Sequence, residues 1–181
     1  MLMLCCVLPQ ISLVWAENTD AQDGAHVHIQ DGVVYCDVQT FTQEPYILKV
    51  IGSGSPMTVV WQFDVVQARD YWLDKTVVSV RLGRQVIPDL VTQRWLMRDL
   101  SGGVVKYTDD AHEAMRFLTS MEHIAVVDVS VLDAQQSYML TTTSYIHEGE
   151  EEEEGWWSSL TDWGEDMGTV ALELSEQKED E

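Results

Sequence analysis

Basic residues are scarce in this sequence. It has 10 Lys and Arg against 31 Asp and Glu among 181 residues, so its formal net charge is −21. A nucleic-acid-binding surface needs clustered Lys and Arg to neutralise phosphates, and basic residues this few and scattered do not supply one. An anionic membrane surface is disfavoured for the same reason. Composition therefore predicts no nucleic acid and no anionic lipid as partner.

Long apolar runs are scarce as well. The first segment, residues 1–16, is apolar and uncharged. A membrane-spanning helix needs about twenty consecutive apolar residues, whereas this run is shorter and is interrupted at Pro9. We therefore expect no permanent membrane anchor.

Residues 1–16 are instead typical of a signal peptide. They end in Val14-Trp15-Ala16, directly before the polar Glu17. Signal peptidase accepts small residues one and three positions before the cut, which predicts cleavage after Ala16 and a periplasmic or secreted protein. The basic stretch that usually precedes the apolar one is absent, and a buried N-terminal strand is the alternative.

Cysteine is also rare. Cys5 and Cys6 lie in the apolar segment, so a cleaved chain would keep only Cys36 and could form no internal disulfide. Cys36 lies in the apolar run of residues 33–38. A lone cysteine in such a run is more often a small buried side chain than a nucleophile, and we expect it in the core.

Seven Trp and 45% hydrophobic residues are enough for a folded core. The length suits one domain, which we place at residues 25–174. We expect residues 17–24 to be a flexible N-terminus and residues 175–181 to be a disordered acidic tail.

The pattern within the domain is mainly that of β-strands. Residues 24–30 and 33–40 are β-branched runs separated by Asp31-Gly32, a dipeptide that favours a tight hairpin turn. Further strands are predicted, in chain order, at residues 57–66, 71–82, 91–98, 104–107, 124–132 and 137–146. The predicted fold is a mainly β, antiparallel β-sandwich.

Two short helices interrupt these strands. The first is predicted at about residues 44–52, because Pro45 suits a first helical turn and the Gly-Ser-Gly-Ser-Pro stretch from Gly52 must end it. The second is predicted at about residues 109–120, with Thr108 or Asp109 as its N-cap.

The chain becomes strongly acidic from Glu148. Residues 148–181 hold fourteen acids and one Lys. Five consecutive Glu at residues 150–154 repel one another, which predicts a solvated acidic loop at residues 148–155.

Three tryptophans follow this loop closely. Trp156, Trp157 and Trp163 are costly to leave in water, so this segment must dock on its own sheet as a last strand or on a partner. We predict that they are interaction anchors, while the surrounding acids set the association rate and exclude anionic partners.

Other candidates lie between and after the two long central strands. Charged groups beside tryptophan at such a position predict either a buried ion pair that fixes the hairpin register or a ligand groove, and the ion pair is the reading we favour. These structural or groove candidates are Arg69, Asp70, Trp72, Asp74 and Trp95.

No cofactor, metal site or catalytic residue is predicted. His26 and His28 share one face of a strand, but two ligands do not make a zinc or copper site. Ser53 lies between two glycines but lacks the strand and helix that frame a nucleophile elbow, so we interpret it as part of a turn.

Several motifs follow one another along the chain in a characteristic order and spacing. They are Arg69-Asp70-Tyr71-Trp72-Leu73-Asp74, Arg81-Leu82, Val91-Thr92, Arg94-Trp95, the predicted helix from Ala111 to Leu118 and Trp157-Ser158-Ser159-Leu160-Thr161-Asp162-Trp163. This order and spacing resemble a known family of secreted proteobacterial proteins, catalogued as domain of unknown function 4390. The resemblance covers roughly residues 25–174 and implies an exported bacterial protein without an established activity, whose relatives are often encoded near a membrane sensor kinase. A Leu-Pro stretch usual in the family is replaced here by the run of Glu at residues 150–154.

These observations predict a non-enzymatic interaction or signalling-accessory module with a protein partner at the cell envelope. One alternative is a small-molecule or carbohydrate-binding sandwich, in which Trp61, Trp72 and Trp95 would stack on a ligand. A hydrolase is the less favoured alternative.

Overall fold

The computed structural model describes residues 24–40, 43–69, 73–103, 105–149 and 165–172. The first half of this part contains β1 (Gly24–Gln30), β2 (Val33–Gln39), α1 (Glu44–Gly52), β3 (Met57–Gln67), β4 (Lys75–Asp89) and β5 (Arg94–Asp99). The second half contains β6 (Val105–Thr108), α2 (Ala111–Thr119), β7 (Ser120–Asp128), the short 3₁₀ helix η1 (Val129–Val131), β8 (Tyr138–Glu148) and β9 (Glu165–Leu172).

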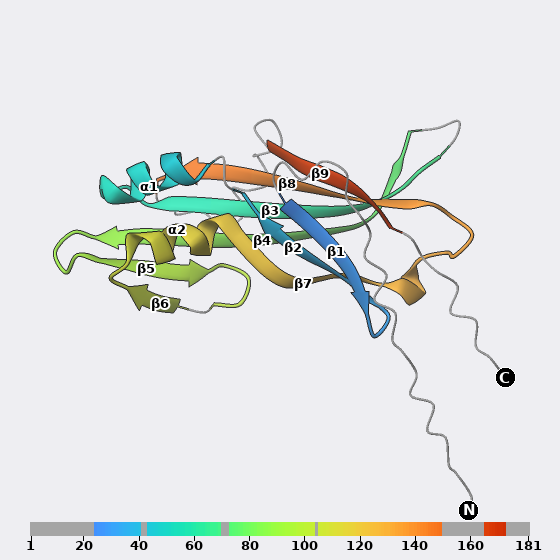
Figure 1. Cartoon of the computed structure of the whole chain (residues 1–181), viewed down its shortest axis with the longest axis horizontal. Coiled ribbons are helices and arrows are strands. Elements are labelled where there is room, and N and C mark those ends of the chain that lie inside the picture. Colours follow the sequence, from blue (N-terminus) through green and yellow to red (C-terminus); the bar gives the residue numbers. More distant parts are fainter. Residues whose placement is uncertain (1–23, 41–42, 70–72, 104, 150–164, 173–181) are drawn as a thin grey trace, which may run out of the picture.

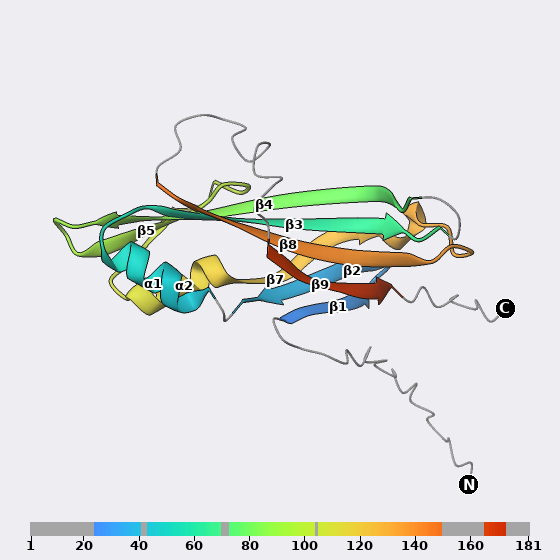
Figure 2. The ribbon, with the colours of Figure 1, turned by 90° about the horizontal axis from the view of Figure 1, so that it is seen from above.

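The strands form two antiparallel sheets, which confirms the predicted mainly β fold. The larger sheet has the order β6-β5-β4-β3-β8-β9, and the smaller one has the order β1-β2-β7 (Figure 1). Figure 2 shows the two layers: the larger sheet forms one, and α1, α2 and the smaller sheet lie side by side along the other. The core therefore lies between one face of the larger sheet and this mixed second layer.

β3 is the centre of the larger sheet. It pairs along its whole length with β4 on one side and with β8 on the other. Successive side chains of a strand point to opposite faces, and the residues of β3 that point toward the second layer are almost fully buried. They are Met57, Val59, Trp61, Phe63 and Val65.

Two local predictions are confirmed. β1 and β2 form a hairpin in which Asp31 and Gly32 adopt φ angles of 50° and 77°, as a two-residue turn of this kind requires. α1 has a proline in its first turn and buries Ile47, Val50 and Ile51 against the core.

The strand predicted at residues 91–98 is wrong at its start. β4 continues to Asp89, β5 begins at Arg94, and Val91 is 93% exposed in the turn between them. Asp89 causes this turn, because its carboxylate accepts hydrogen bonds from the backbone N–H groups of Val91 and Thr92 and from the Thr92 hydroxyl.

The N-cap predicted for α2 is also wrong. Asp110 caps the helix, accepting a hydrogen bond from the backbone N–H of His112. Thr108 is instead the buried last residue of β6. α2 ends at Thr119 and β7 begins at Ser120, four residues before the predicted strand at 124–132.

Because α2 passes directly into β7, backbone carbonyls at this junction need hydrogen-bond donors from elsewhere, and side chains of the larger sheet supply them. The last carbonyls of a helix have no partner within the helix. Arg84 donates from Nη1 to the carbonyls of Phe117 and Ser120, at 2.9 and 2.5 Å, and Trp61 donates from Nε1 to the carbonyl of Leu118 at 3.3 Å. A cation at a helix C-terminus is also favourable for the helix dipole. Arg84 and Trp61 thus connect the two layers at the α2–β7 junction.

β9 pairs antiparallel with β8, so the last described segment joins the chain's own sheet. This agrees with one of the two placements that the sequence left open for the C-terminal segment. None of the helices in the described part of the chain is long and apolar enough to cross a membrane.

The α2–β7 junction gives a first prediction. Replacing Arg84 by Met keeps most of the apolar stem but leaves two partly buried carbonyls without their charged donor, so we expect Arg84→Met to lower the free energy of unfolding by about 2–3 kcal/mol. Urea denaturation measures this. The matched control is Arg81→Met on the outward face of the same strand, where the exposed Arg81 side chain donates to Gln62; it should cost less than about 0.5 kcal/mol. Equal losses in the two variants would contradict the role given to Arg84.

Candidate functional site

Several residues predicted to form a site cannot be placed. Asp70, Trp72, Trp156, Trp157 and Trp163 lie outside the described residues.

The predicted ion pair between the long strands is described only in part, because Asp70 and Trp72 lie outside the described residues. Arg69 and Asp74 are both exposed. The backbone N–H of Arg69 donates to the Asp74 carboxylate at 3.2 Å, so Asp74 closes the loop at the end of the β3–β4 hairpin. The register of this hairpin is instead carried by the alternation of core residues in both strands.

The described tryptophans do not offer an open stacking surface. Trp61 is completely buried at the α2–β7 junction. Trp95 is half-buried, and its Nε1 lies 3.5 Å from the carbonyl of Ile51 in α1. Both indoles serve the contact between the layers, which does not support the predicted role of Trp61 and Trp95 in stacking on a sugar.

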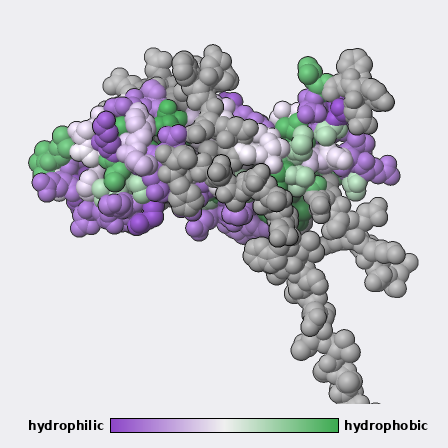
Figure 3. Space-filling model, turned by 45° about the horizontal axis from the view of Figure 1, so that its top comes forward, coloured by the Kyte–Doolittle hydropathy of each residue, from purple (hydrophilic) through white to green (hydrophobic). Residues whose placement is uncertain are grey.

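An exposed apolar surface lies at the opposite end of the larger sheet from the β3–β4 turn. We call it the β5–β6 surface. Figure 3 shows apolar atoms gathered at the end of the molecule where the β4–β5 hairpin lies. Leu90 and Val91 at the hairpin tip are 69% and 93% exposed, and Val105 and Tyr107 on the edge strand β6 are 51% and 52% exposed. The surface consists of Leu90, Val91, Arg94, Arg98, Val105 and Tyr107.

Two arginines of β5 belong to this surface. Arg98 lies opposite Val105 in the sheet register, and the Arg94 guanidinium carbon lies 5.4 Å from the centroid of the Tyr107 ring. Both side chains are exposed, and among the described residues neither has a carboxylate oxygen within the 4.0 Å that defines an ion pair.

The acids nearest in register and in sequence are engaged elsewhere. Asp89 is the cross-strand neighbour of Arg94, but it accepts the turn hydrogen bonds from Thr92 and Val91, which hold the pKa of its carboxyl below the ordinary value. Asp99 follows Arg98 but points to the other face of β5, opposite Arg84 in the register, and accepts from the backbone N–H groups of Ser101 and Gly102. Neither carboxylate forms an ion pair with Arg94 or Arg98, although the charged Asp89 carboxylate stays on the same face as Arg94.

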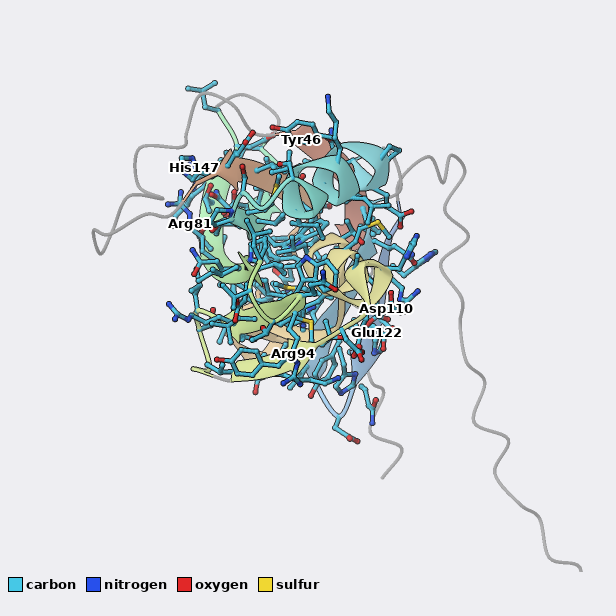
Figure 4. All side chains as sticks on the ribbon, turned by 90° about the vertical axis from the view of Figure 1, so that its left-hand side faces the viewer. Tyr46, Arg81, Arg94, Asp110, Glu122 and His147 are labelled. Atoms are coloured by element: carbon cyan, nitrogen blue, oxygen red, sulfur yellow. The ribbon has the colours of Figure 1, made fainter. Side chains whose placement is uncertain are left out.

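Charged side chains lie on both sides of the molecule. In Figure 4, Arg81 and His147 project from the side of the larger sheet, while Asp110 and Glu122 project from the side of α2 and the smaller sheet. The outward face of the larger sheet carries both signs of charge: Arg81, Arg94, Arg98, Asp64 and Asp89.

A second polar cluster lies on the outward face of the smaller sheet. The rings of His28, Tyr35 and His123 contact one another, with Tyr35 and His123 centroids 4.1 Å apart. Asp37 lies in a β-bulge opposite His123, accepts the backbone N–H of His123, and lies 3.7 Å from Nδ1 of His28. His123 adopts a φ angle of 57°, which is unusual for a residue other than glycine.

A shallow cavity of about 360 Å³ adjoins this cluster. Its lining includes His26, Asp37, Glu122 and His123. In the described ranges, no three His, Cys, Asp or Glu side chains are arranged to hold a metal ion. The geometry suits hydrogen bonding to a small polar molecule. Sequence reasoning identified His26 and His28 but missed Asp37 and His123, because nothing in the sequence marks a bulge between two strands that are distant in the chain.

Comparison with known proteins gives one match. The model of a family described as a domain of unknown function, DUF4390, matches residues 21–148. The chain belongs to this family. No curated protein and no solved structure matches the chain.

The DUF4390 match extends from just before β1 to the end of β8. It contains the β5–β6 surface, the polar cluster on the smaller sheet and the α2–β7 junction. The match ends before β9 and before residues 157–163, which the sequence resemblance had included.

Cys36 of this DUF4390 chain is a core residue, as the sequence predicted. Its side chain is completely buried, and burial raises the pKa of the thiol to about 12. A thiolate is the reactive form of cysteine, so a buried neutral thiol is a poor nucleophile.

Thiol labelling tests this assignment. At about pH 8 we expect Ellman's reagent to leave Cys36 unmodified in the folded protein and to modify it in urea, with peptide mass spectrometry to separate it from Cys5 and Cys6. Because the folded-state pKa is raised above the ordinary value of 9.0, the stability that the neutral thiol contributes is fully present below pH 9.0 and is lost as the pH rises toward about 12. Rapid labelling of the native protein would show that Cys36 is accessible.

Proposed function

We propose that this protein is an exported, non-enzymatic accessory module that binds a protein partner at the cell envelope through the β5–β6 surface. The observation that carries the proposal is the combination of exposed Val91 and Tyr107 with Arg94 and Arg98, which are exposed and form no ion pair with any described residue, at one end of the larger sheet.

The residue types at this surface support recognition of a protein. Tyr and Arg are enriched among the residues that contribute most to protein–protein binding, because they combine a large contact area with directed polar groups. Tyr107 lies on the short strand β6, whose outer edge is not paired with any strand that the structure describes, so its backbone groups are open to a partner. Apolar side chains as exposed as Val91 gain free energy when a partner removes them from water.

The proposal of a non-enzymatic role is supported by the environment of Cys36. This thiol would be the natural nucleophile of a covalent mechanism, but it lies in the core with its pKa raised by burial. The support for export is the apolar, uncharged segment at residues 1–16 with small residues before Glu17.

Intact mass spectrometry of protein expressed with its own N-terminus tests export. We expect the protein recovered from outside the cytoplasm to begin at Glu17, because signal peptidase cuts after Ala16. Replacing Ala16 by a large residue that blocks the peptidase pocket should leave residues 1–16 attached. Recovery of the uncleaved chain in the cytoplasm would contradict the proposal.

Crosslinking in cells followed by affinity purification tests the binding surface. We expect a specific partner to be captured by the wild-type protein and lost in the double variant Val91→Ser, Tyr107→Ser, since both side chains are exposed and their loss leaves the fold intact. The matched control is Leu73→Ser, Val131→Ser, which changes side chains that are 92% and 62% exposed elsewhere on the molecule. Capture that is equal in both double variants would rule out this surface, and circular dichroism verifies that all variants fold.

The cavity beside His123 favours a second function, the binding of a small polar or carbohydrate ligand. Asp37 and His26 line it and offer charged and hydrogen-bonding groups. If no partner depends on the β5–β6 surface, this cavity becomes the leading candidate site.

A further inference from the structure

The β5–β6 surface carries exposed positive groups although the chain as a whole is strongly acidic. The sequence, at a net charge of −21, led us to expect that the protein repels anionic partners. Arg94 and Arg98 are nevertheless exposed and have no ion-pair partner among the described residues, and Asp89, the cross-strand neighbour of Arg94, is hydrogen-bonded within its own turn. Lys106, which points to the other face of β6, is by contrast paired with Glu113.

The spacing of these groups is that of a strand. Arg94 and Arg98 are four residues apart on one face of β5, which places them about 13 Å from each other. Leu96 lies between them on the same face and pairs in register with Tyr107, while Arg98 pairs with Val105. Along this face, the apolar side chain of Leu96 and the exposed Tyr107 beside it thus lie between the guanidinium groups of Arg94 and Arg98.

β6 is also an edge of its sheet. It pairs with β5 on one side, and the strand order of the larger sheet places no other described strand on its outer side. An edge strand can accept an extended peptide as an additional strand, in which backbone hydrogen bonds give affinity and alternate side chains give specificity.

We propose that the partner presents an extended acidic segment that adds to the β6 edge. Two of its carboxylates, four residues apart, face Arg94 and Arg98, and an apolar residue between them packs on Tyr107. This inference rests on the proposed function and assigns the chemistry of the partner.

Charge complementarity favours this occupant over a second copy of the chain. Two chains of net charge −21 repel each other at long range, whereas a local pair of arginines attracts a short acidic segment. Two arginines are too few for a lipid surface, which needs a cluster of basic residues.

A synthetic peptide provides the first test. The probe is a fluorescein-labelled peptide that contains the sequence Glu-Thr-Val-Thr-Glu, in which the two carboxylates are four residues apart. We expect saturable binding to the full chain by fluorescence anisotropy, weakening as salt is added. The same peptide with both glutamates replaced by lysine should bind at least about tenfold more weakly.

Variants of the protein locate the binding site. We expect Arg94→Glu, Arg98→Glu to weaken binding of the glutamate peptide by at least about tenfold and to improve binding of the lysine peptide. The matched control is Arg81→Glu, which should leave binding unchanged. Arg81 is exposed on the same face of the sheet but lies on β4, which β5 separates from β6. Equal weakening by Arg81→Glu, or equal binding of both peptides to the wild-type chain, would overturn the inference.

Sedimentation velocity tests whether a second copy of the chain occupies the surface. If the wild-type protein is a dimer and the variant Arg94→Glu, Arg98→Glu is a monomer, a second copy occupies the surface and the inference is overturned. In the crosslinking experiment, a partner that is lost with Val91→Ser, Tyr107→Ser but retained with the double arginine variant would refute the acidic segment while leaving the proposed function standing. Loss with both variants supports both proposals.

Discussion

The arrangement of the whole molecule depends on how the larger sheet meets the α2–β7 junction. A helix that continues directly into a strand leaves several carbonyls without partners at a place where water is excluded. Arg84 and Trp61, from neighbouring strands of the larger sheet, donate to three of these carbonyls. The guanidinium also lies 4.6 Å from the centroid of the Phe117 ring. These hydrogen bonds from Arg84 and Trp61 therefore hold α2, the smaller sheet and the larger sheet together at one junction.

This contact determines which face of the larger sheet remains outside. Because α1, α2 and the smaller sheet all occupy the same face, the side chains of β4 and β5 that alternate with core residues must point away from the second layer. Arg84 is then an interior group, and Arg81, Arg94 and Arg98 are exterior ones. Strand alternation thus decides which arginines of β4 and β5 are interior and which are exterior.

Local signals in the sequence predicted much of the fold. The sequence could not show contacts between segments that are distant in the chain. The Asp31-Gly32 turn and the proline at the start of α1 each depend on neighbouring residues. Alternation continued past Asp89, so the turn made by its carboxylate was missed. Arg84 was a visible signal, a charged residue at an inward position between Leu82 and Val86, but its carbonyl partners lie more than thirty residues away. The bulge at Asp37 and His123 likewise depends on two strands that are distant in the chain.

Turn formation and strand alternation explain why the arginines of the β5–β6 surface form no ion pair with the nearest acids. An aspartate opposite an arginine on adjacent strands can form a weak surface ion pair. Asp89 lies opposite Arg94, but its carboxylate accepts hydrogen bonds from the turn that follows it. Asp99 points to the other face of β5, opposite Arg84, and is bonded to the turn after that strand. The Asp89 carboxylate keeps its negative charge, so what distinguishes Arg94 and Arg98 in this acidic chain is that they are exposed and, within the described residues, beyond ion-pair distance of any carboxylate.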